Sequence, residues 1–276
     1  MNWSKAKNIA IIAFLLLNIL LVGLLRLDAR QYALAAQSQQ AITAVLAKNN
    51  ITLAQNFDFV RHDPIRRLAL FENNFNRNAL ANLLMIYKND ILMTIESDYT
   101  KFHNELEEVR FYNDGIVRYT NLGNVYRELQ TKSEMRMFAT NLMRSLGEDM
   151  RSFVLDTSHE KNDNTLVLEY RQMYRGNIVY SNFLIFTFKN GNISTIDFSF
   201  SPVDGFLGSV REMRPSDEIL LTFMRNIEGY AIIKEMDIVH KAWGQTATPY
   251  YRITYMQHDQ LNTMLINGYT NSLGNP

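Results

Sequence analysis

One uninterrupted apolar run near the N-terminus constrains this 276-residue chain more than any other feature. Asn8 to Leu25 reads NIAIIAFLLLNILLVGLL and contains no charged residue. A helix of this run would be roughly 27 Å long, which is close to the hydrocarbon core of a bilayer. The sequence therefore predicts a transmembrane helix over residues 8–25, preceded by a short tail of residues 1–7.

The charges beside this run predict its orientation. The flanking charged groups are the amino terminus, Lys5 and Lys7 on one side and Arg26, Asp28 and Arg30 on the other. The N-terminal side is the more positive, so the positive-inside rule places the N-terminus in the cytoplasm. We therefore expect a single-pass protein of the cell membrane whose C-terminal domain is extracellular. The alternative is a cleaved signal peptide ending near Ala33-Leu34-Ala35. The run is longer than the usual signal-peptide core, which favours an uncleaved anchor.

The predicted transmembrane helix contains one polar side chain near its middle, Asn18. An unpaired amide in lipid is costly, so Asn18 is expected to bond across to another helix. We predict a helix contact made by Asn18, Phe14 and Gly23, because a glycine permits close approach. A second interpretation stays open, in which Asn18 bonds its own backbone and the helix is only an anchor.

The remaining chain predicts an extracytoplasmic α+β fold of antiparallel sheets packed against helices. Residues 26–50 form a juxtamembrane helix that continues from the membrane as a stalk. Residues 51–130 form a first lobe and residues 131–276 a second. Half-buried alternation in the strands indicates that each sheet has one covered face. The predicted strands are Ile51–Val60, Ile65–Phe71, Ile91–Tyr99, Val109–Tyr112, Ile116–Tyr119, Thr165–Met173, Ile178–Phe188, Ile193–Phe200, Tyr230–Trp243, Tyr250–Gln257 and Met264–Tyr269.

A unit of one helix followed by three strands is predicted in three successive copies in this region. The helices carry apolar stripes over Leu80–Tyr87, Met135–Leu146 and Ile219–Ile227. Thr131 to Glu134 has the spacing of a capping box, and Asp114-Gly115 predicts a type I′ hairpin. Helices packed on one face of such meanders make an α+β layer.

Composition excludes several kinds of chemistry. Lys+Arg and Asp+Glu number 28 each, which disfavours a nucleic-acid partner, and there is no cysteine. The five histidines are not spaced as a zincin motif, so we interpret them as isolated surface residues. Glu105, Glu107 and Glu108 form the densest acidic cluster, which we interpret as a solvated face. We expect no enzyme activity, no cofactor and no metal site.

The N-terminal dozen residues carry a family resemblance. Asn2-Trp3-Ser4-Lys5-Ala6-Lys7, followed by one hydrophobic helix, resembles the YycI (WalI) members of the YycH/YycI family. The helix from Pro215 and the later Pro249-Tyr250-Tyr251-Arg252 and Ile266-Asn267-Gly268-Tyr269 resemble the closing pattern of YycI, YycH and PepSY-type domains. Asn2 departs from the pattern, which has an acidic residue there.

The resemblance implies a function that the residues alone do not. YycI proteins are membrane-anchored regulators of the WalK (YycG) sensor histidine kinase, a two-component system that controls the cell wall of Gram-positive bacteria. The implied partners are a YycH-like protein and the kinase, in a hetero-oligomer, through transmembrane-helix and ectodomain contacts. The alternative is an anchored or secreted PepSY-like binding or inhibitor module, or a cell-wall enzyme. A soluble version lacking residues 1–30 would keep its activity only under this alternative.

Overall fold

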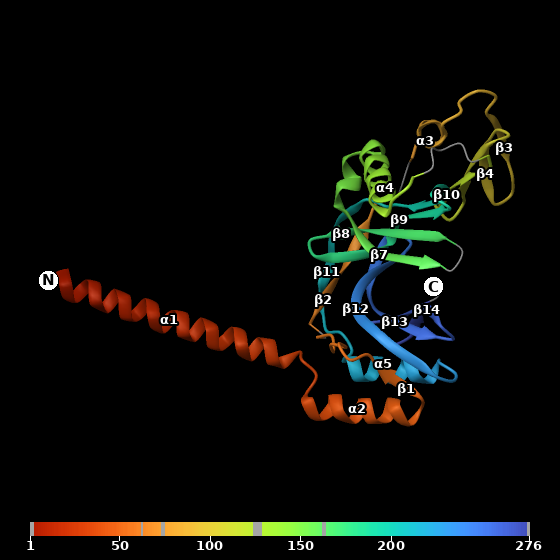
Figure 1. The fold of residues 1–276 in the computed structure, drawn as a ribbon. Helices are drawn as coiled ribbons and strands as arrows, with labels where there is room; N and C mark the ends of the chain where they lie inside the picture. Colours follow the sequence, from red (N-terminus) through yellow and green to blue (C-terminus); the bar gives the residue numbers. More distant parts are fainter. Residues whose placement is uncertain (1–2, 62, 73–74, 124–128, 162–163, 275–276) are drawn as a thin grey trace. The chain divides into compact units, whose positions relative to one another are not determined.

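The computed structural model describes residues 3–61, 63–72, 75–123, 129–161 and 164–274. Over these residues the fold is mixed α+β, as the sequence predicts (Figure 1). The helices are α1 (Trp3–Gln31), α2 (Ala36–Lys48), α3 (Arg77–Leu84), α4 (Lys132–Leu146), the short 3-10 helix η1 (Glu148–Ser152) and α5 (Ser216–Arg225). The strands are β1 (Ile51–Leu53), β2 (Ile65–Leu70), β3 (Leu92–Ile95), β4 (Tyr99–His103), β5 (Glu107–Tyr112), β6 (Val117–Asn121), β7 (Phe153–Lys161), β8 (Thr165–Tyr174), β9 (Asn177–Lys189), β10 (Asn192–Ser199), β11 (Val203–Arg211), β12 (Ala231–Trp243), β13 (Thr246–Gln257), β14 (Gln260–Asn267) and β15 (Leu273–Gly274).

The chain divides into two compact units that interleave along the sequence. The first unit is Met1–Ile65, Val210–Asp237 and Tyr250–Pro276, and the second is Arg66–Ser209 and Ile238–Pro249. Two of the boundaries fall inside the long strands β12 and β13. This division differs from the predicted consecutive lobes, 51–130 and 131–276, because strands pair with partners that are distant in sequence.

In the first unit, α2 and α5 pack together beside the end of β12. α2 buries Ile42 and Leu46, and α5 buries Ile219, Leu220 and Phe223. β1 pairs with β12 in parallel, with Ile51 opposite Ala231, and β13 pairs antiparallel with β14. The predicted stalk is wrong in one respect: α1 ends at Gln31, and α2 is a separate helix that packs within this unit.

The second unit is built on two antiparallel meanders that share one sheet. Its strands are ordered β7-β8-β9-β10-β6-β5-β4-β3, and each neighbouring pair is antiparallel. α3 precedes the β3–β6 meander, and α4 with η1 precedes the β7–β10 meander. Each of these two copies of the predicted unit therefore contains four strands rather than three. The sheet is also not purely antiparallel, because β9 pairs with β12 in parallel at Val239 and His240.

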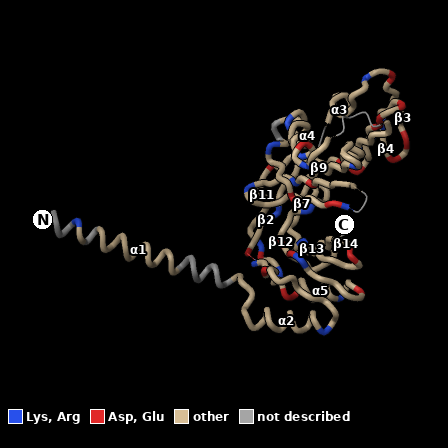
Figure 2. Tube along the Cα trace, viewed as in Figure 1, with Lys and Arg blue, Asp and Glu red and all other residues tan. Residues whose placement is uncertain are grey.

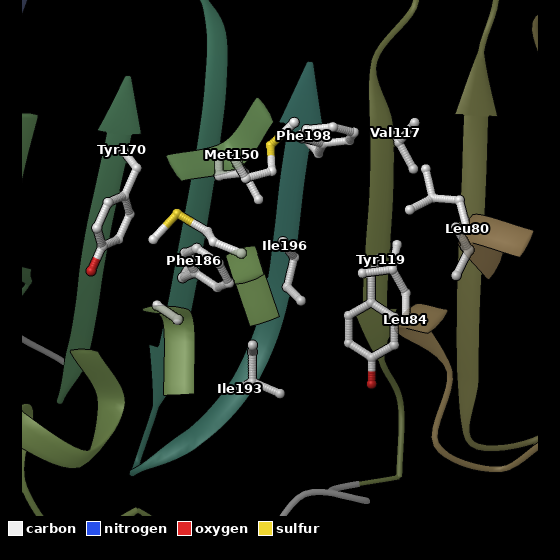
Figure 3. Close-up of a cluster of buried hydrophobic side chains, with 14 of the residues drawn as sticks. Leu80, Leu84, Val117, Tyr119, Met150, Tyr170, Phe186, Ile193, Ile196 and Phe198 are labelled. Atoms are coloured by element: carbon white, nitrogen blue, oxygen red, sulfur yellow. The ribbon is translucent and has the colours of Figure 1, made fainter. Parts of the chain in front are cut away.

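A large apolar cluster fills much of the interior of the second unit (Figure 3), and a smaller cluster is formed by Leu68, Leu70, Val179 and Ala247. α3 contributes Leu80 and Leu84 to the large cluster, and β6 contributes Val117 and Tyr119. The strands of the second meander contribute residues such as Phe186 and Ile196, which are 0% and 1% exposed. Burial of this kind contributes about 25 cal/mol for each Å² of apolar surface removed from water.

The helix signals in the sequence are confirmed at α4. The Thr131 side chain accepts from the Glu134 N–H at 3.2 Å, and the Glu134 carboxylate accepts from the Thr131 N–H at 3.1 Å. The predicted stripe is shifted, because Ala139 and Met143 are the buried positions. Phe138 is only partly buried, and it packs edge-to-face on Phe188 at 6.2 Å.

The hairpin at Asp114-Gly115 is confirmed, but its predicted turn type is wrong. Gly115 has φ +88°, whereas Asp114 is not in the positive-φ region that a type I′ turn requires at both centres. Gly115 N–H donates to the Tyr112 carbonyl at 3.1 Å, and the Asp114 carboxylate accepts from the Ile116 N–H. The turn is a type I turn closed by a glycine bulge, which the aspartate side chain stabilises.

Several predicted strand bounds need correction. The strand predicted over Ile51–Val60 ends at Leu53, and the strand predicted over Ile91–Tyr99 is β3, which ends at Ile95 and leads through a turn at residues 96–99 into β4. Strands β4, β7, β11 and the two-residue β15 were not predicted. Two of these, β7 and β11, show why. β7 ends in polar residues that resemble a turn, and β11 contains two glycines and is largely exposed, so neither shows apolar alternation.

Candidate interaction surfaces

The middle of α1 is an apolar helix surface that no other described part of the chain covers. Ten large apolar side chains between Ile11 and Val22 are each 48–68% exposed. Figure 2 shows no Lys, Arg, Asp or Glu in this stretch. Monomeric proteins rarely expose a contiguous apolar surface of this size, so α1 requires a partner or an apolar medium.

The predicted membrane segment Asn8–Leu25 lies within α1. The side chains of its residues 9–10 and 24–25 fall outside the described residues. In the part of the chain that the structure describes, no helix has both the length and the hydropathy needed to cross a membrane.

The three predicted contact residues do not share one face of α1. Asn18 Nδ2 donates to the Phe14 carbonyl at 2.8 Å, so these two residues lie one turn apart on the same face. Gly23 follows Asn18 by five positions, which turns it about 140° away around the helix. A Cβ atom added at Gly23 would meet no atom within 4 Å, so packing within this chain does not require a glycine there. The bond to Phe14 is the one expected of the second interpretation, in which Asn18 bonds its own backbone.

The histidines are not gathered into a site. His62 lies outside the described residues, and no three His, Asp or Glu side chains among the described ones are placed to hold a metal ion. The prediction of surface histidines is wrong for His240, which is fully buried on β12. Its Nε2 lies 2.9 Å from the Arg66 carbonyl. Burial lowers the pKa of His240, and the hydrogen bond to Arg66 offsets part of that effect.

The interpretation of the acidic cluster as a solvated face is wrong for two of its three residues. Glu105 is exposed, but Glu107 is 0% and Glu108 8% exposed. The Glu107 carboxylate accepts hydrogen bonds from the N–H groups of Ile86 and Tyr87 and from the Tyr119 hydroxyl, at 2.8–3.1 Å. Three donors make burial of this charge possible, so Glu107 fixes the chain that leaves α3. The sequence did contain one sign of this burial, because glutamates occupy the start of a strand that is otherwise largely apolar.

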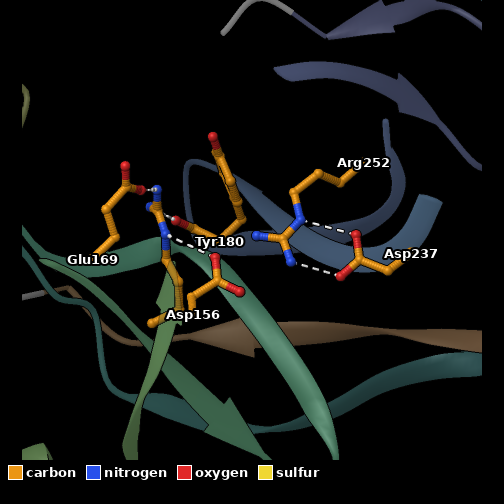
Figure 4. Close-up of polar contacts among 6 residues, drawn as sticks. Asp156, Glu169, Tyr180, Asp237 and Arg252 are labelled. Atoms are coloured by element: carbon orange, nitrogen blue, oxygen red, sulfur yellow. Dashed lines mark hydrogen bonds and ion pairs between the residues drawn. The ribbon is translucent and has the colours of Figure 1, made fainter. Parts of the chain in front are cut away.

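Two buried arginines, one in each unit, form charge-assisted polar contacts (Figure 4). In the first unit, Arg252 makes a bidentate pair with Asp237, at 2.8 and 2.6 Å. In the second unit, Arg171 donates to the Tyr180 carbonyl at 2.6 Å and to Glu169 at 3.0 Å. The Arg171 guanidinium also lies 4.1 Å from the centre of the Tyr180 ring.

These contacts hold strands together and place no nucleophile beside a base. Each guanidinium is bonded to a carboxylate or a carbonyl, and the carboxylates that pair with it are thereby also occupied. Stable arginine–carboxylate pairs of this kind fix geometry and specificity rather than chemistry.

Comparison with known proteins shows a fold and no family. No family model matches the sequence, and no curated protein matches it. The fold is similar to that of an uncharacterized protein from Eubacterium rectale ATCC 33656, with a TM-score of 0.53 and 9% identity over 82% of this chain and 91% of that one. At this identity the likeness shows the fold alone.

Two further solved structures show lower scores. The C-terminal domain of YpeB from Bacillus megaterium matches with a TM-score of 0.37 and 10% identity, over 74% of this chain and 97% of that one. YycH from Bacillus subtilis matches with a TM-score of 0.46 and 9% identity, over 73% of this chain, which spans about half (53%) of YycH. Both scores are below 0.5.

Proposed function

We propose that this protein is a membrane-anchored accessory protein that regulates a two-component sensor histidine kinase controlling cell-wall metabolism. The observation that carries the proposal is α1, whose apolar side chains are exposed over residues 11–22. An apolar helix at one end of a folded α+β chain suits an anchor in the cell membrane, with the units outside. The resemblance of the N-terminal residues to YycI proteins is the reason for proposing a sensor kinase as the partner.

The kinase contact is proposed to run through the helix over residues 8–25. In this proposal the helix is the part of the chain that lies in the bilayer, so it is the part that can contact the kinase's own transmembrane helices. Asn18 retains an amide oxygen that its bond to Phe14 does not use. This oxygen is available to a donor on a neighbouring helix, and measured bonds of this kind average about 0.6 kcal/mol. Such an energy shifts a two-state population about threefold.

The partners in this proposal are the kinase and a YycH-like protein, in a hetero-oligomer. The first experiment measures kinase-dependent reporter expression in cells carrying Asn18→Leu at matched protein levels. Leu16→Ala, which changes a neighbouring side chain of α1 that makes no polar bond, is the control. We expect Asn18→Leu to change output and to weaken cross-linking between the two proteins' helices, while Leu16→Ala leaves both unchanged.

The opposite results would redirect the proposal. Unchanged output and unchanged cross-linking in Asn18→Leu would mean that Asn18 is a passive anchor residue. Its hydrogen bond to the Phe14 carbonyl would then be its only role. Replacing the whole segment with an unrelated anchor then tests the helix itself. If that replacement, or a soluble version lacking residues 1–30, retains full function, the transmembrane mechanism is wrong and the alternative of a PepSY-like module or enzyme is favoured.

A second experiment tests topology. A reporter fused after residue 276 should be active outside the membrane, and the mature chain should keep its N-terminal residues. Recovery of a processed chain that begins at Ala36 would show a cleaved signal peptide instead.

A further inference from the structure

Strand β3 ends the sheet of the second unit with an open edge. It pairs with β4 on one side, and no described strand pairs with its other side. Glu96 N–H donates to the Tyr99 carbonyl at 2.9 Å. Hydrogen-bonded residues alternate in an antiparallel pair, so Thr94 also faces β4, and the N–H and C=O groups of Met93 and Ile95 face outward.

The side chains of β3 are as open as its backbone. Leu92, Met93 and Ile95 are 62%, 59% and 73% exposed. Met93 lies opposite Phe102, which is 8% exposed and belongs to the apolar cluster, so Met93 and Ile95 continue the buried face of the sheet beyond its cover. Proteins usually blunt such edges with lysine, proline or a bulge, and Leu92–Ile95 contains neither residue and shows an unbroken register.

Acidic residues gather at both ends of this edge. Asp90 lies before β3, and Glu96 and Asp98 lie after it, all exposed. Figure 2 shows the concentration of acidic residues around β3 and β4. Among the described residues, cations near β3 include Lys101, which lies opposite Thr94, Arg77, which donates to Thr100, and Arg110, which lies over the Tyr99 ring and is paired with Glu108.

A hollow of about 600 Å³ lies at the Asp90 end of β3. Its apolar lining includes Tyr87 and Leu92, and its acidic lining is Asp90 and Glu105, with His103 beside them. A lysine or arginine suits such a hollow, because its methylene stem packs on the apolar side chains while its charge meets the carboxylates.

A second copy of this chain is a poor occupant of the edge. Antiparallel pairing of two β3 strands about their centre would bring Asp90 of one copy close to Glu96 and Asp98 of the other. Like charges directly opposite one another in a sheet are destabilising. The charges therefore favour a partner of opposite sign.

We propose that the outer edge of β3 binds an extended segment of another protein as an added strand, with an apolar centre and lysine or arginine at its ends. Main-chain hydrogen bonds to Met93 and Ile95 supply affinity, and the apolar side chains and acidic ends select the segment. This surface is separate from α1, and the inference does not depend on the proposed regulation of a kinase.

The test measures fluorescence anisotropy of a labelled synthetic peptide, Lys-Lys-Val-Thr-Val-Thr-Val-Lys-Lys, with the full chain in detergent. The matched probe replaces every lysine with glutamate. We expect the lysine peptide to bind about tenfold or more tightly than the glutamate peptide, and to lose affinity as salt is added. Met93→Pro removes one outward N–H without removing a bond to β4, and should weaken binding of the lysine peptide about tenfold.

Met93→Val, which keeps the N–H and suits a strand, is the control and should bind like the unchanged chain. Thermal unfolding and circular dichroism verify that both variants fold. If Met93→Pro does not fold, the double change Asp90→Lys with Glu96→Lys tests whether the acidic ends of β3 select the peptide. This variant should bind the glutamate peptide more tightly than the lysine peptide.

Four results would overturn the inference. These are equal binding of the two peptides, full binding by folded Met93→Pro, no binding of either peptide up to about 1 mM, and a dimer of the full chain that Met93→Pro dissociates. The last result would assign the edge to a second copy. Kinase output plays no part in these measurements, so their failure leaves the proposed function standing, and its failure leaves the β3 edge standing.

Discussion

Replacing Glu107 with glutamine should destabilise the second unit far more than a surface change of the same kind. The carboxylate receives the N–H of Ile86 at 3.1 Å, the N–H of Tyr87 at 2.8 Å and the Tyr119 hydroxyl at 2.9 Å. A hydrogen bond to a charged group contributes about 1.5–3 kcal/mol, and a neutral one about 0.5–1.5 kcal/mol. Glutamine would weaken two of these bonds and turn the third acceptor into a donor. Leaving one buried group unpaired costs about 1–3 kcal/mol.

The expected loss in the free energy of unfolding is therefore about 3–5 kcal/mol for Glu107→Gln. Glu105→Gln makes the same chemical change on an exposed residue and should cost less than about 0.5 kcal/mol. Hydrogen exchange of the Ile86 and Tyr87 amides gives a local assay, and both should exchange about a hundredfold faster in Glu107→Gln. Unchanged exchange at both amides, with a loss no larger than that of Glu105→Gln, would refute the role assigned to the carboxylate.

Three further changes test other parts of the fold. Phe223→Ala, at a residue that is 0% exposed, should cost about 3–5 kcal/mol by chemical denaturation, whereas Phe138→Ala should cost about 1–2 kcal/mol because its ring is only partly buried. Burial lowers the pKa of His240 in the folded state, so the unfolded state binds more protons below the ordinary pKa of about 6.5. The free energy of unfolding should therefore fall as the pH drops below about 6.5. His240→Gln removes this group and should make the free energy of unfolding depend less on pH below about 7. Asp237→Asn should cost about 1–3 kcal/mol, measured in the same way, because it breaks the bidentate pair with Arg252.

Local signals in the sequence predicted local structure well. The capping box at Thr131 and Glu134 depends on residues three apart, and the structure contains both of its hydrogen bonds. The glycine at position 115 likewise predicted a hairpin, although the aspartate before it changed the turn type through its own side-chain bond. Caps and turns depend on residues within a few positions of one another, so the sequence alone can predict them.

Long-range pairings could not be predicted in the same way. β1 pairs in parallel with β12, about 180 residues away, and nothing in Ile51–Leu53 distinguishes this partner from any other strand. The same limit explains Glu107. Its three donors come from α3's exit and from β6, so its burial becomes visible only when the meander has brought Ile86, Tyr87 and Tyr119 to one point.

The surfaces left uncovered say more about function than the buried polar groups do. Glu107 accepts hydrogen bonds from three donors, and Arg252 is bonded to Asp237. These buried polar groups are therefore used for contacts within the fold. Most side chains of α1 between residues 11 and 22, and Leu92, Met93 and Ile95 of β3, are apolar and exposed among the described residues. Exposed apolar surface is unfavourable in water, so it persists where something else covers it. The exposed apolar side chains of α1 and of β3 are therefore the places where the two proposed contacts with other molecules are expected to form.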